Sequence, residues 1–416
     1  MFSFRNFNKY NKFTLLFIIF IIGVTFYGPV QIGPITIRNL VTVLMLLSCI
    51  NHYRGMWIDR MFLAYIVFIF FCMISVLLDP YANPADFFSS KIFGYYLPCY
   101  VAYFASYIYF VKFNLSTKPI FITFLTTGIL NAIVSILQFL QLNNIWHIIY
   151  NLLGLSLPNY LTAIEERDID VDNMLGFTTT GLFQKAVANG YYLCLTCILS
   201  FYLFFRRTNN KDVFCFFLFW LINLIGLFVC QERAAFVLGL LGSFYMFFHS
   251  MRKSVPLSLL FVIIAIYLFS VNIEFDEDTL GRFADMSYSS SRGSLNNNSV
   301  SFLSTNLLIG GIAYYRHLFY IPPHNLFYNA FIYSGIFGGL ILLGIFFRQC
   351  WRCVKYALSI NRNYGLAIIS IALLAYQGNS FAHNSSLVTG DVTIWLLWGI
   401  ISFGYCHDGF IIKNNH

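Results

Sequence analysis

Long apolar runs recur along the whole chain, and short polar segments separate most of them. About twelve runs approach the length of roughly 20 residues that a helix needs to cross the apolar core of a bilayer. They lie near residues 13–29, 35–50, 61–78, 92–111, 119–141, 187–205, 213–230, 234–250, 255–272, 326–347, 364–380 and 391–406. Since unpaired backbone groups are costly in lipid, each run predicts a helix. The pattern predicts an all-α, polytopic membrane protein with about 12 transmembrane helices.

The polar segments divide the chain into five predicted regions. These are a five-helix membrane segment (1–141), a first long loop (142–186), central helices (187–272), a second, larger loop (273–325) and C-terminal helices (326–416). The first loop carries an amphipathic stretch, Ile145–Leu153, that suits a membrane interface. The second combines a Ser/Asn-rich tract with a helical-looking stretch, 303–320. Loops of this length without an obvious fold are usually functional.

Composition supports a chain that faces lipid. Hydrophobic residues make up 59% of the 416 residues and charged residues only 10%, with a mean hydropathy of +0.71. One soluble core cannot enclose that much apolar surface, so the excess must contact lipid. The formal charge of +8 does not indicate nucleic acid, because the basic residues are scattered through short loops rather than gathered in one patch.

The distribution of charge predicts the orientation of the helices. With the N-terminus inside, most of the 25 Lys and Arg fall on the cytoplasmic side, as the positive-inside rule requires. The exceptions are Arg38, Lys91, Arg167, Lys185, Arg233, Arg282, Arg292 and Arg316. Of the 17 acidic residues, only Asp59, Asp212 and Asp408 lie inside. Both long loops are therefore predicted to lie on the outer side.

Arg233 stands in the very short link between the runs at 213–230 and 234–250, directly after Glu232. An arginine at a helix N-terminus has the wrong sign for the helix dipole unless an anion shares the site. A phosphate there would meet the guanidinium and the first backbone N–H groups together. The other interpretation is an interfacial arginine paired with Glu232 or a lipid headgroup, and the residue types leave both open.

His324 follows two prolines and opens the run at 326–347 together with Asn325. At the positive end of a helix, the charged form of an imidazole is disfavoured, and a neutral imidazole can act as a general base. The alternative is a histidine that only caps the helix or lies at the interface. Position alone favours that simpler role.

The second loop also carries three arginines, Arg282, Arg292 and Arg316. Arginine binds phosphate bidentately, and such groups could stabilise negative charge on a leaving diphosphate. An ordinary solvated loop is the alternative. The acidic run from Glu165 to Asp172 could hold a divalent ion, but such runs are more often solvated loop faces. We therefore expect no metal site and no cofactor.

One set of motifs resembles a known family. His324-Asn325, nine residues, then Gly335-x-x-Gly338 is similar to the His-Asn-x9-Gly-x-x-Gly pattern of the O-antigen ligase and polymerase superfamily. Arg233 matches the arginine that opens a span in that family, and the segment around Arg292 resembles its loop arginine. The stretches 176–190 and 281–285 resemble further family segments. The likeness covers the order of elements from about 176 to 340.

The resemblance implies a metal-independent glycosyltransferase that acts on undecaprenyl-diphosphate-linked oligosaccharides at the periplasmic face of the bacterial inner membrane. In that picture His324 takes the proton of the acceptor hydroxyl, and Arg233 and Arg292 hold the leaving diphosphate. The remaining expected substrate contacts are Arg282, Arg316, Asn325, Glu232 and Lys185. Expected partners are membrane lipid, a chain-length regulator and a flippase.

Three functions are compatible with this reading. The basic N-terminus, the segment 28–38 and the modest second loop favour an O-antigen polymerase over an O-antigen ligase, whose acceptor is lipid A-core. A flippase for the same lipid-linked units would also have about twelve spans. Transporters usually show internal repeats, broken helices and ionisable groups near the midplane, and the sequence places its polar residues in the outer loops instead.

Overall fold

The computed structural model describes most of the chain. The described residues are 4–28, 30–33, 35–53, 59–155, 179–183, 185–206, 210–251, 290–323, 325–360, 363–378, 388 and 390–403. They are almost entirely helical. The chain divides into two compact units, which we call the first unit (1–120, 288–356 and 380–416) and the second unit (121–287 and 357–379). Each unit is assembled from segments that are far apart in the sequence.

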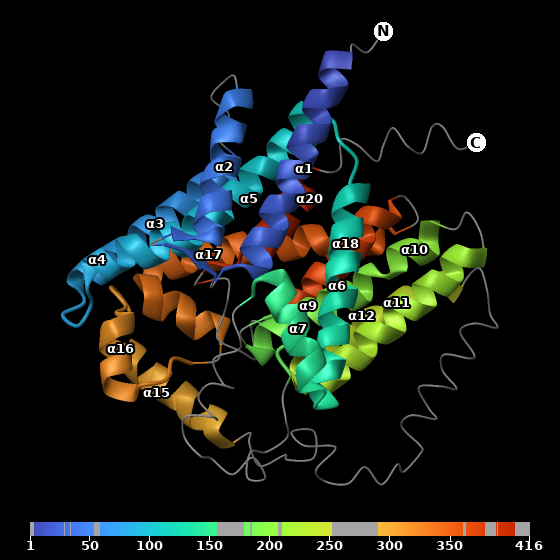
Figure 1. Cartoon of the computed structure of the whole chain (residues 1–416). Coiled ribbons are helices and arrows are strands. Elements are labelled where there is room, and N and C mark those ends of the chain that lie inside the picture. Colours follow the sequence, from blue (N-terminus) through green and yellow to red (C-terminus); the bar gives the residue numbers. More distant parts are fainter. Residues whose placement is uncertain are drawn as a thin grey trace. The chain divides into compact units, whose positions relative to one another are not determined.

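The first unit contains most of the helices on either side of the central part of the chain (Figure 1). Its elements are α1 (Phe4–Phe26), α2 (Ile37–His52), α3 (Arg60–Leu78), α4 (Pro84–Asp86), η1 (Phe87–Tyr96), α5 (Leu97–Tyr107), η2 (Ile108–Lys112), α15 (Ser290–Asn306), α16 (Ile312–Phe319), α17 (Leu326–Leu358) and α20 (Val392–Phe403). Two short strands, β1 (Gln31–Ile32) and β2 (Ile35–Thr36), pair antiparallel in the link between α1 and α2.

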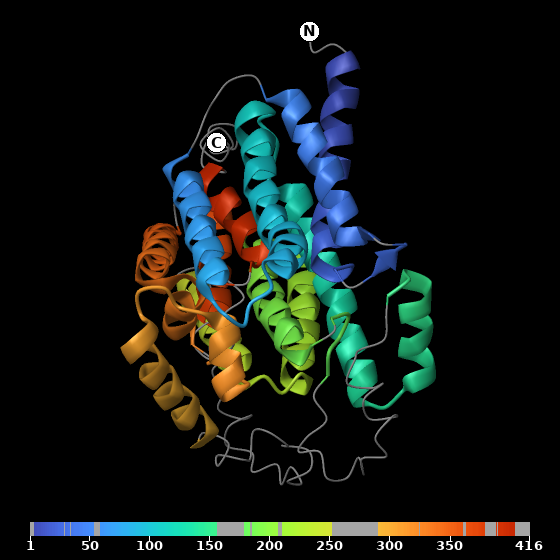
Figure 2. The same cartoon turned by 90° about the vertical axis from the view of Figure 1, so that its left-hand side faces the viewer.

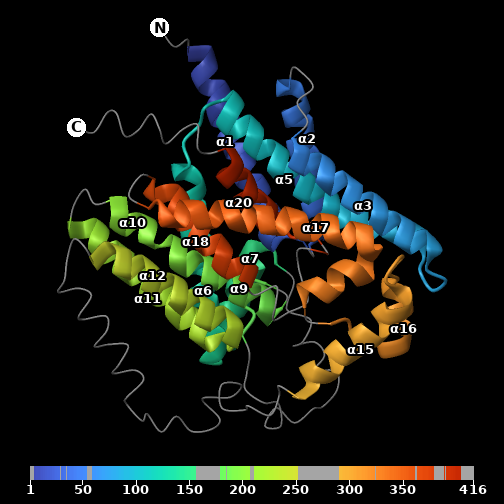
Figure 3. The same cartoon turned by 180° about the vertical axis from the view of Figure 1, so that it is seen from behind.

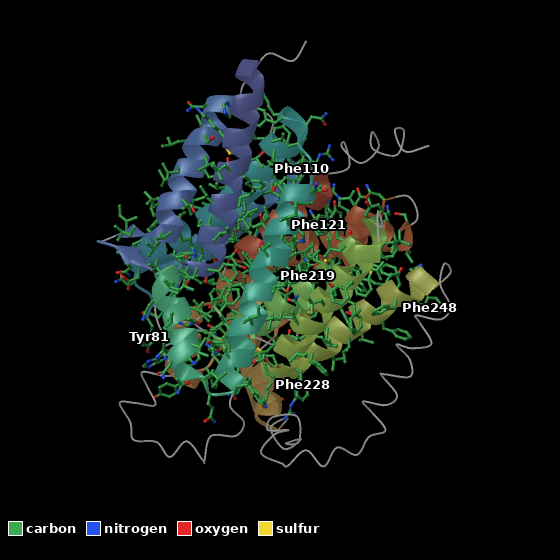
Figure 4. All side chains as sticks on the ribbon, turned by 45° about the vertical axis from the view of Figure 1, so that its right-hand side comes forward. Tyr81, Phe110, Phe121, Phe219, Phe228 and Phe248 are labelled. Atoms are coloured by element: carbon green, nitrogen blue, oxygen red, sulfur yellow. The ribbon has the colours of Figure 1, made fainter. Side chains whose placement is uncertain are left out.

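The second unit is a helical bundle. Its elements are α6 (Lys118–Phe139), α7 (Asn143–Leu153), α9 (Ala186–Leu199), α10 (Phe201–Arg206), α11 (Asn210–Val229), α12 (Arg233–Met251) and α18 (Tyr364–Gly378). Helix α7 lies alongside the end of α6 (Figure 2). Aromatic side chains are frequent on these helices, and Figure 4 labels Phe121, Phe219, Phe228 and Phe248 among them.

The α9 helix forms the centre of the second unit, and every one of its residues from Asn189 to Leu199 is buried. Helix α12 runs parallel to it: a Cβ at Gly190 would lie 2.8 Å from the Cβ of Glu232, and a Cβ at Gly242 would lie 2.3 Å from Ile198. Helix α6 runs antiparallel to α9, since Asn131 contacts Asn189 while Phe121 stacks on Tyr202. Helices α9 and α12 therefore start at the same end of the unit.

Helix directions in the first unit follow the same alternation. Asp59 at the start of α3 accepts a hydrogen bond from Tyr103 near the end of α5 at 2.5 Å. Phe68, further along α3, packs against Tyr96, which directly precedes α5, so α3 and α5 are antiparallel. Phe71 stacks on Phe337 while Met61 contacts Gln349, so α17 is antiparallel to α3. Within each unit these directions agree with the predicted inside–outside order.

Four helices among the described residues are long and apolar enough to cross a membrane. They are Arg60–Leu78, Lys118–Phe139, Ala186–Phe205 and Leu326–Leu358. Six shorter apolar helices match other predicted runs: Lys12–Phe26, Ile37–His52, Val213–Val229, Arg233–His249, Tyr364–Gly378 and Val392–Phe403. The run at 255–272 lies outside the described residues. The all-α membrane class is supported, while the count of twelve stays a prediction.

The predicted amphipathic stretch is confirmed as helix α7. Trp146 and Tyr150 on one face are buried, whereas Ile145, Ile148 and Leu152 on the other are exposed. The helix ends at Gly154, which adopts the left-handed conformation that suits a C-terminal glycine. An exposed apolar row on a helix that follows a membrane-length helix suits a lipid interface.

The structure differs from the sequence interpretation in the second long loop and in α17. The polar tract of the loop is helical from Ser290, so α15 and α16 form a helical pair broken at Gly310 and Gly311 (Figure 3). Helix α17 continues to Leu358, well past the predicted end at 347. It also contains a non-helical residue, Gly335, which apolar periodicity cannot reveal.

Candidate functional site

A polar turn at Thr179–Leu182 lies buried at the end of the second unit where α9 and α12 begin. Thr179, Thr180, Gly181 and Leu182 are all buried, although the turn has no regular secondary structure of its own. Its backbone groups cannot reach water, so side chains of the helices must satisfy them. The sequence supplies those side chains on α6, α7 and α9.

Two amides on α6 bind the backbone of the turn. The Oδ1 atom of Asn131 accepts from the Leu182 N–H at 2.7 Å. The Oε1 atom of Gln138 accepts from the N–H groups of Thr180 and Gly181 at 3.0 and 2.9 Å, and its Nε2 atom donates to the Gly181 carbonyl. One amide therefore serves both a donor and an acceptor of the turn, as its chemistry allows.

Asn189 connects the same turn to α9. It accepts a hydrogen bond from Asn131 at 2.7 Å and donates to Ser135 and to the Thr179 carbonyl, both at 3.0 Å. The hydroxyl of Tyr150 on α7 donates to the Gly181 carbonyl. Gly181 itself has a φ of 55°, and a Cβ there would lie 2.3 Å from the Asn131 Oδ1 atom, so glycine is required.

The short link before Arg233 packs on the first turn of α9. The thiol of Cys230 lies 3.2 Å from the Ala186 carbonyl and 3.4 Å from the Thr179 carbonyl. Gln231 adopts a φ of 57°, which turns the chain sharply so that α12 starts at Arg233. The link, the polar turn and the start of α9 therefore form one connected structure.

Three of the predicted site residues belong to this structure. Arg233 is the first residue of α12 and is half-buried. Lys185 is exposed at the N-cap of α9, and Glu232 is 3% exposed, with its Cβ against Gly190. Two parallel helix N-termini and two cationic side chains thus lie at the same end of the second unit. Helix N-termini and cations both favour an anion.

Side-chain hydrogen bonds to the backbone fix the start of α17 in the first unit. Asn325 caps the helix, since its Oδ1 atom accepts from the Phe327 N–H at 2.8 Å. Asn329 donates to the carbonyls of Pro323 and Asn325 at 2.5 and 3.0 Å. His324, between these two residues, lies outside the described residues. Its role as the base stays a prediction, and Asn325 is a helix cap in the structure.

The predicted loop arginines differ in how far the structure describes them. Arg316 lies exposed on α16, and its guanidinium interacts with the Tyr333 hydroxyl on α17 by charge and hydrogen bonding. Arg292 belongs to the first turn of α15, of which the backbone alone is described. Arg282 lies outside the described residues, as does the acidic run 165–172. Among the residues that the structure does describe, none group as possible metal ligands.

Asp79 is a residue that the sequence interpretation did not single out. The residue is 7% exposed, and its carboxylate accepts from three backbone N–H groups: Tyr81 at 3.0 Å, Ala313 at 2.8 Å and Tyr314 at 3.1 Å. A carboxylate at the start of α16 satisfies N–H groups that have no partner within the helix and complements the helix dipole. It fastens the α15–α16 pair to the end of α3.

Gly335 and the Gly310–Gly311 loop form a second connection in the first unit. Gly335 has φ 65° and ψ −172°, a conformation essentially confined to glycine. The break leaves the Ile332 carbonyl available, and the Gly311 N–H donates to it at 2.8 Å. A Cβ at Gly335 would lie 2.3 Å from the Leu308 carbonyl oxygen. The first glycine of the family-like motif therefore allows a break in the helix and the close approach of a loop.

Gly338 and Gly339, by contrast, serve packing. A Cβ at Gly338 would lie 2.8 Å from the Cβ of Phe71 on α3, and one at Gly339 would meet the ring of Phe331. Tyr315 lies on the buried face of α16. Burial raises the pKa of its hydroxyl, which hydrogen-bonds to Ser299 on α15 at 3.2 Å.

These features define a chain whose described residues are almost entirely helical, with membrane-length apolar helices and polar contacts at the helix ends that are predicted to face outward. No protein-family model matches the chain, and no curated protein matches it. The likeness to the O-antigen ligase and polymerase superfamily therefore rests on the short motifs quoted above.

Proposed function

We propose that the protein is an O-antigen polymerase of the bacterial inner membrane, joining undecaprenyl-diphosphate-linked oligosaccharides at the periplasmic face. The observation that supports this most is the shared end of α9 and α12, where Arg233 and Lys185 accompany two helix N-termini. That arrangement favours a diphosphate, the group that leaves during transfer. A helix bundle with a purely structural role does not need cationic side chains at its helix N-termini.

The proposed reaction is a direct displacement. The acceptor hydroxyl attacks the anomeric carbon of the donor, the bond from that carbon to the diphosphate oxygen breaks, and the hydroxyl proton goes to His324. The lipid diphosphate leaves with its electron pair, stabilised by Arg233 and by Arg292. A general base contributes about 10²–10⁴-fold to such a step. Loss of a charged group that binds the leaving oxygen costs about 10²–10³-fold by analogy with other anion-stabilising sites.

The break in α17 at Gly335 gives some support to a flippase, because transporters often use broken helices around a substrate site. The contacts around the break favour an enzyme over a flippase. The loop at Gly310 and Gly311 fills the break with backbone contacts and takes up the Ile332 carbonyl. Among the described residues, the atoms nearest to a Cβ at Gly310 or Gly335 all belong to the backbone.

A gene deletion tests the proposal. The deleted strain is complemented with wild type, His324→Ala or Arg233→Ala at equal membrane levels, and its lipopolysaccharide is separated on a silver-stained gel. A polymerase predicts core plus a single repeat unit in the deleted strain and a full ladder with wild type. Bare core with accumulated lipid-linked polymer identifies a ligase. Bare core without such polymer identifies a flippase, and full ladders from both variants contradict the proposed site.

A further inference from the structure

Three aromatic rings gather at the surface where α3 ends and α16 begins. Tyr81 stacks on His317 with ring centroids 4.0 Å apart and planes 16° apart, and on Tyr314 at 5.5 Å and 9°. Tyr314 and His317 are one turn apart on α16 and so share one face of it. We call these three residues the ring group; Figure 4 labels Tyr81.

The ring group is open to the outside. Tyr81 keeps 52% of its surface exposed, and His317 is also exposed. Behind the group, Tyr314 packs against the edge of buried Phe302 on α15, with centroids 5.7 Å apart. An exposed stack on a packed support is costly for a surface that contacts only water, since its apolar ring faces stay hydrated.

Asp79 holds both halves of the ring group in place. Its buried carboxylate binds the backbone N–H of Tyr81 on one side and those of Ala313 and Tyr314 on the other. One side chain therefore fixes the loop that carries Tyr81 and the helix that carries Tyr314 and His317. A surface that is ordered before binding loses less entropy when a ligand arrives.

We propose that the ring group is a glycan-binding subsite that holds a sugar ring of the substrate, an inference that rests on the proposed function. A pyranose has an apolar face of C–H bonds and an edge of hydroxyls. Tyrosine and histidine offer the complement, because their ring faces are apolar and their edges carry O–H and N–H groups. The hydrogen bond from Gly311 to Ile332 connects α16 to the same α17 helix that begins beside His324.

A lipid headgroup layer is the other environment that favours exposed aromatic rings. We favour the glycan because the ring group includes a histidine, and because Asp79 fixes the loop that carries Tyr81 to the short helix α16. The binding experiment below separates the two occupants.

The test is a binding titration with the whole protein in lipid nanodiscs, followed by saturation-transfer NMR. The probe is the soluble surface polysaccharide released by mild acid from wild-type cells of the source strain. Tyr81→Ala is expected to weaken binding about tenfold, which corresponds to losing one aromatic contact. Tyr81→Phe, which keeps the ring, is expected to bind within about threefold of wild type.

Tyr95→Ala serves as the matched control. Tyr95 is also an exposed tyrosine of the first unit, but it lies beside Arg38 and Lys91 on η1. Equal melting temperatures in detergent establish that the variants are folded. No binding by wild type, unchanged binding by Tyr81→Ala, or equal weakening by Tyr95→Ala would each overturn the subsite.

The titration is independent of catalysis. If the gel experiment shows no role in polymer formation while Tyr81→Ala still loses binding, the proposed function fails and the subsite stands. If the ladder depends on the gene but Tyr81 does not affect binding, the subsite alone fails.

Discussion

The two units fix their predicted outer segments in different ways. In the second unit, neutral amides from α6 and α9 hold the Thr179–Leu182 turn, with Asn131, Gln138 and Asn189 all fully or almost fully buried. In the first unit, the single charge of Asp79 and the break at Gly335 hold the α15–α16 pair. An amide network joins whole helices, whereas a carboxylate on three N–H groups joins one short element to the end of another.

This difference predicts how the stability of each unit responds to substitution of these residues. Residues of the amide network also pack between spanning helices, so its loss is expected to lower the stability of the whole unit. The Asp79 contacts hold a helical pair whose apolar cluster, centred on Phe302, Tyr315 and Ile332, is small. Their loss is therefore expected to open that pair locally while the helices behind it stay folded.

The largest effect is expected for Gly335→Ala. The substitution places a Cβ 2.3 Å from the Leu308 carbonyl oxygen in a backbone conformation that non-glycine residues avoid. We expect a loss of about 3 kcal/mol or more, measured by thermal unfolding in detergent. Gly344→Ala on the same helix is the control, because a Cβ there meets nothing within 4 Å. Equal melting temperatures for the two variants would refute the close approach at Gly335.

Asn131→Leu is expected to have the next largest effect. It removes the acceptor of the Leu182 N–H and the donor to Asn189, leaving two buried polar groups unsatisfied. Each such group costs about 1–3 kcal/mol. The melting temperature reports the loss. The control is Thr126→Val, at an exposed position on the same helix where the hydroxyl bonds only to the local backbone. A melting temperature near wild type would mean that the amide network contributes little.

Asp79→Ala is expected to act locally, by about 1.5–3 kcal/mol, since it removes a charged acceptor from three N–H groups. Hydrogen exchange read by mass spectrometry is the measurement. We expect faster exchange in α16 and unchanged exchange in α9. Asp86→Asn, at an exposed position on α4, is the control. Faster exchange throughout both units after the Asp79 change would contradict the distinction between the two anchors.

Tyr150→Phe is expected to have the smallest effect, about 1 kcal/mol, because it removes only the hydroxyl that donates to the Gly181 carbonyl. Gln138 still donates to the same carbonyl at 3.2 Å. Thermal unfolding measures the change against Tyr364→Phe, a ring exposed by 38% in the same unit. A loss comparable to that of Asn131→Leu would show that α7 is a principal support of the turn.

The helices were largely predictable because their signal is local. Ten apolar helices of the structure match predicted runs, since a membrane-length run needs no information beyond its own residues. Amphipathic α7 was predictable for the same reason. The chain also signalled Arg233 and Asn325, because each stands at the boundary of an apolar run, where a helix N-terminus is expected.

The contacts that assemble the loops were not predictable. Asp79 and Ala313 are separated by 234 positions, and nothing local distinguishes Asp79 from an aspartate that merely ends a helix. Asn131 and Gln138 occur within an apolar run, where their partners cannot be read from spacing. The motif drew attention to Gly335, but its backbone conformation depends on the Leu308–Gly311 loop that packs against it.

The central claim is that this chain lengthens lipid-linked glycans. The most direct measurement mixes the purified protein with a lipid extract from the deleted strain, which should accumulate the undecaprenyl-diphosphate-linked repeat unit, and follows product length by mass spectrometry. The account predicts a series of products that grow by whole repeat units with wild type, and a rate reduced about 10²-fold or more with Arg233→Ala. If wild-type protein leaves the repeat units at their original length, the claim is contradicted.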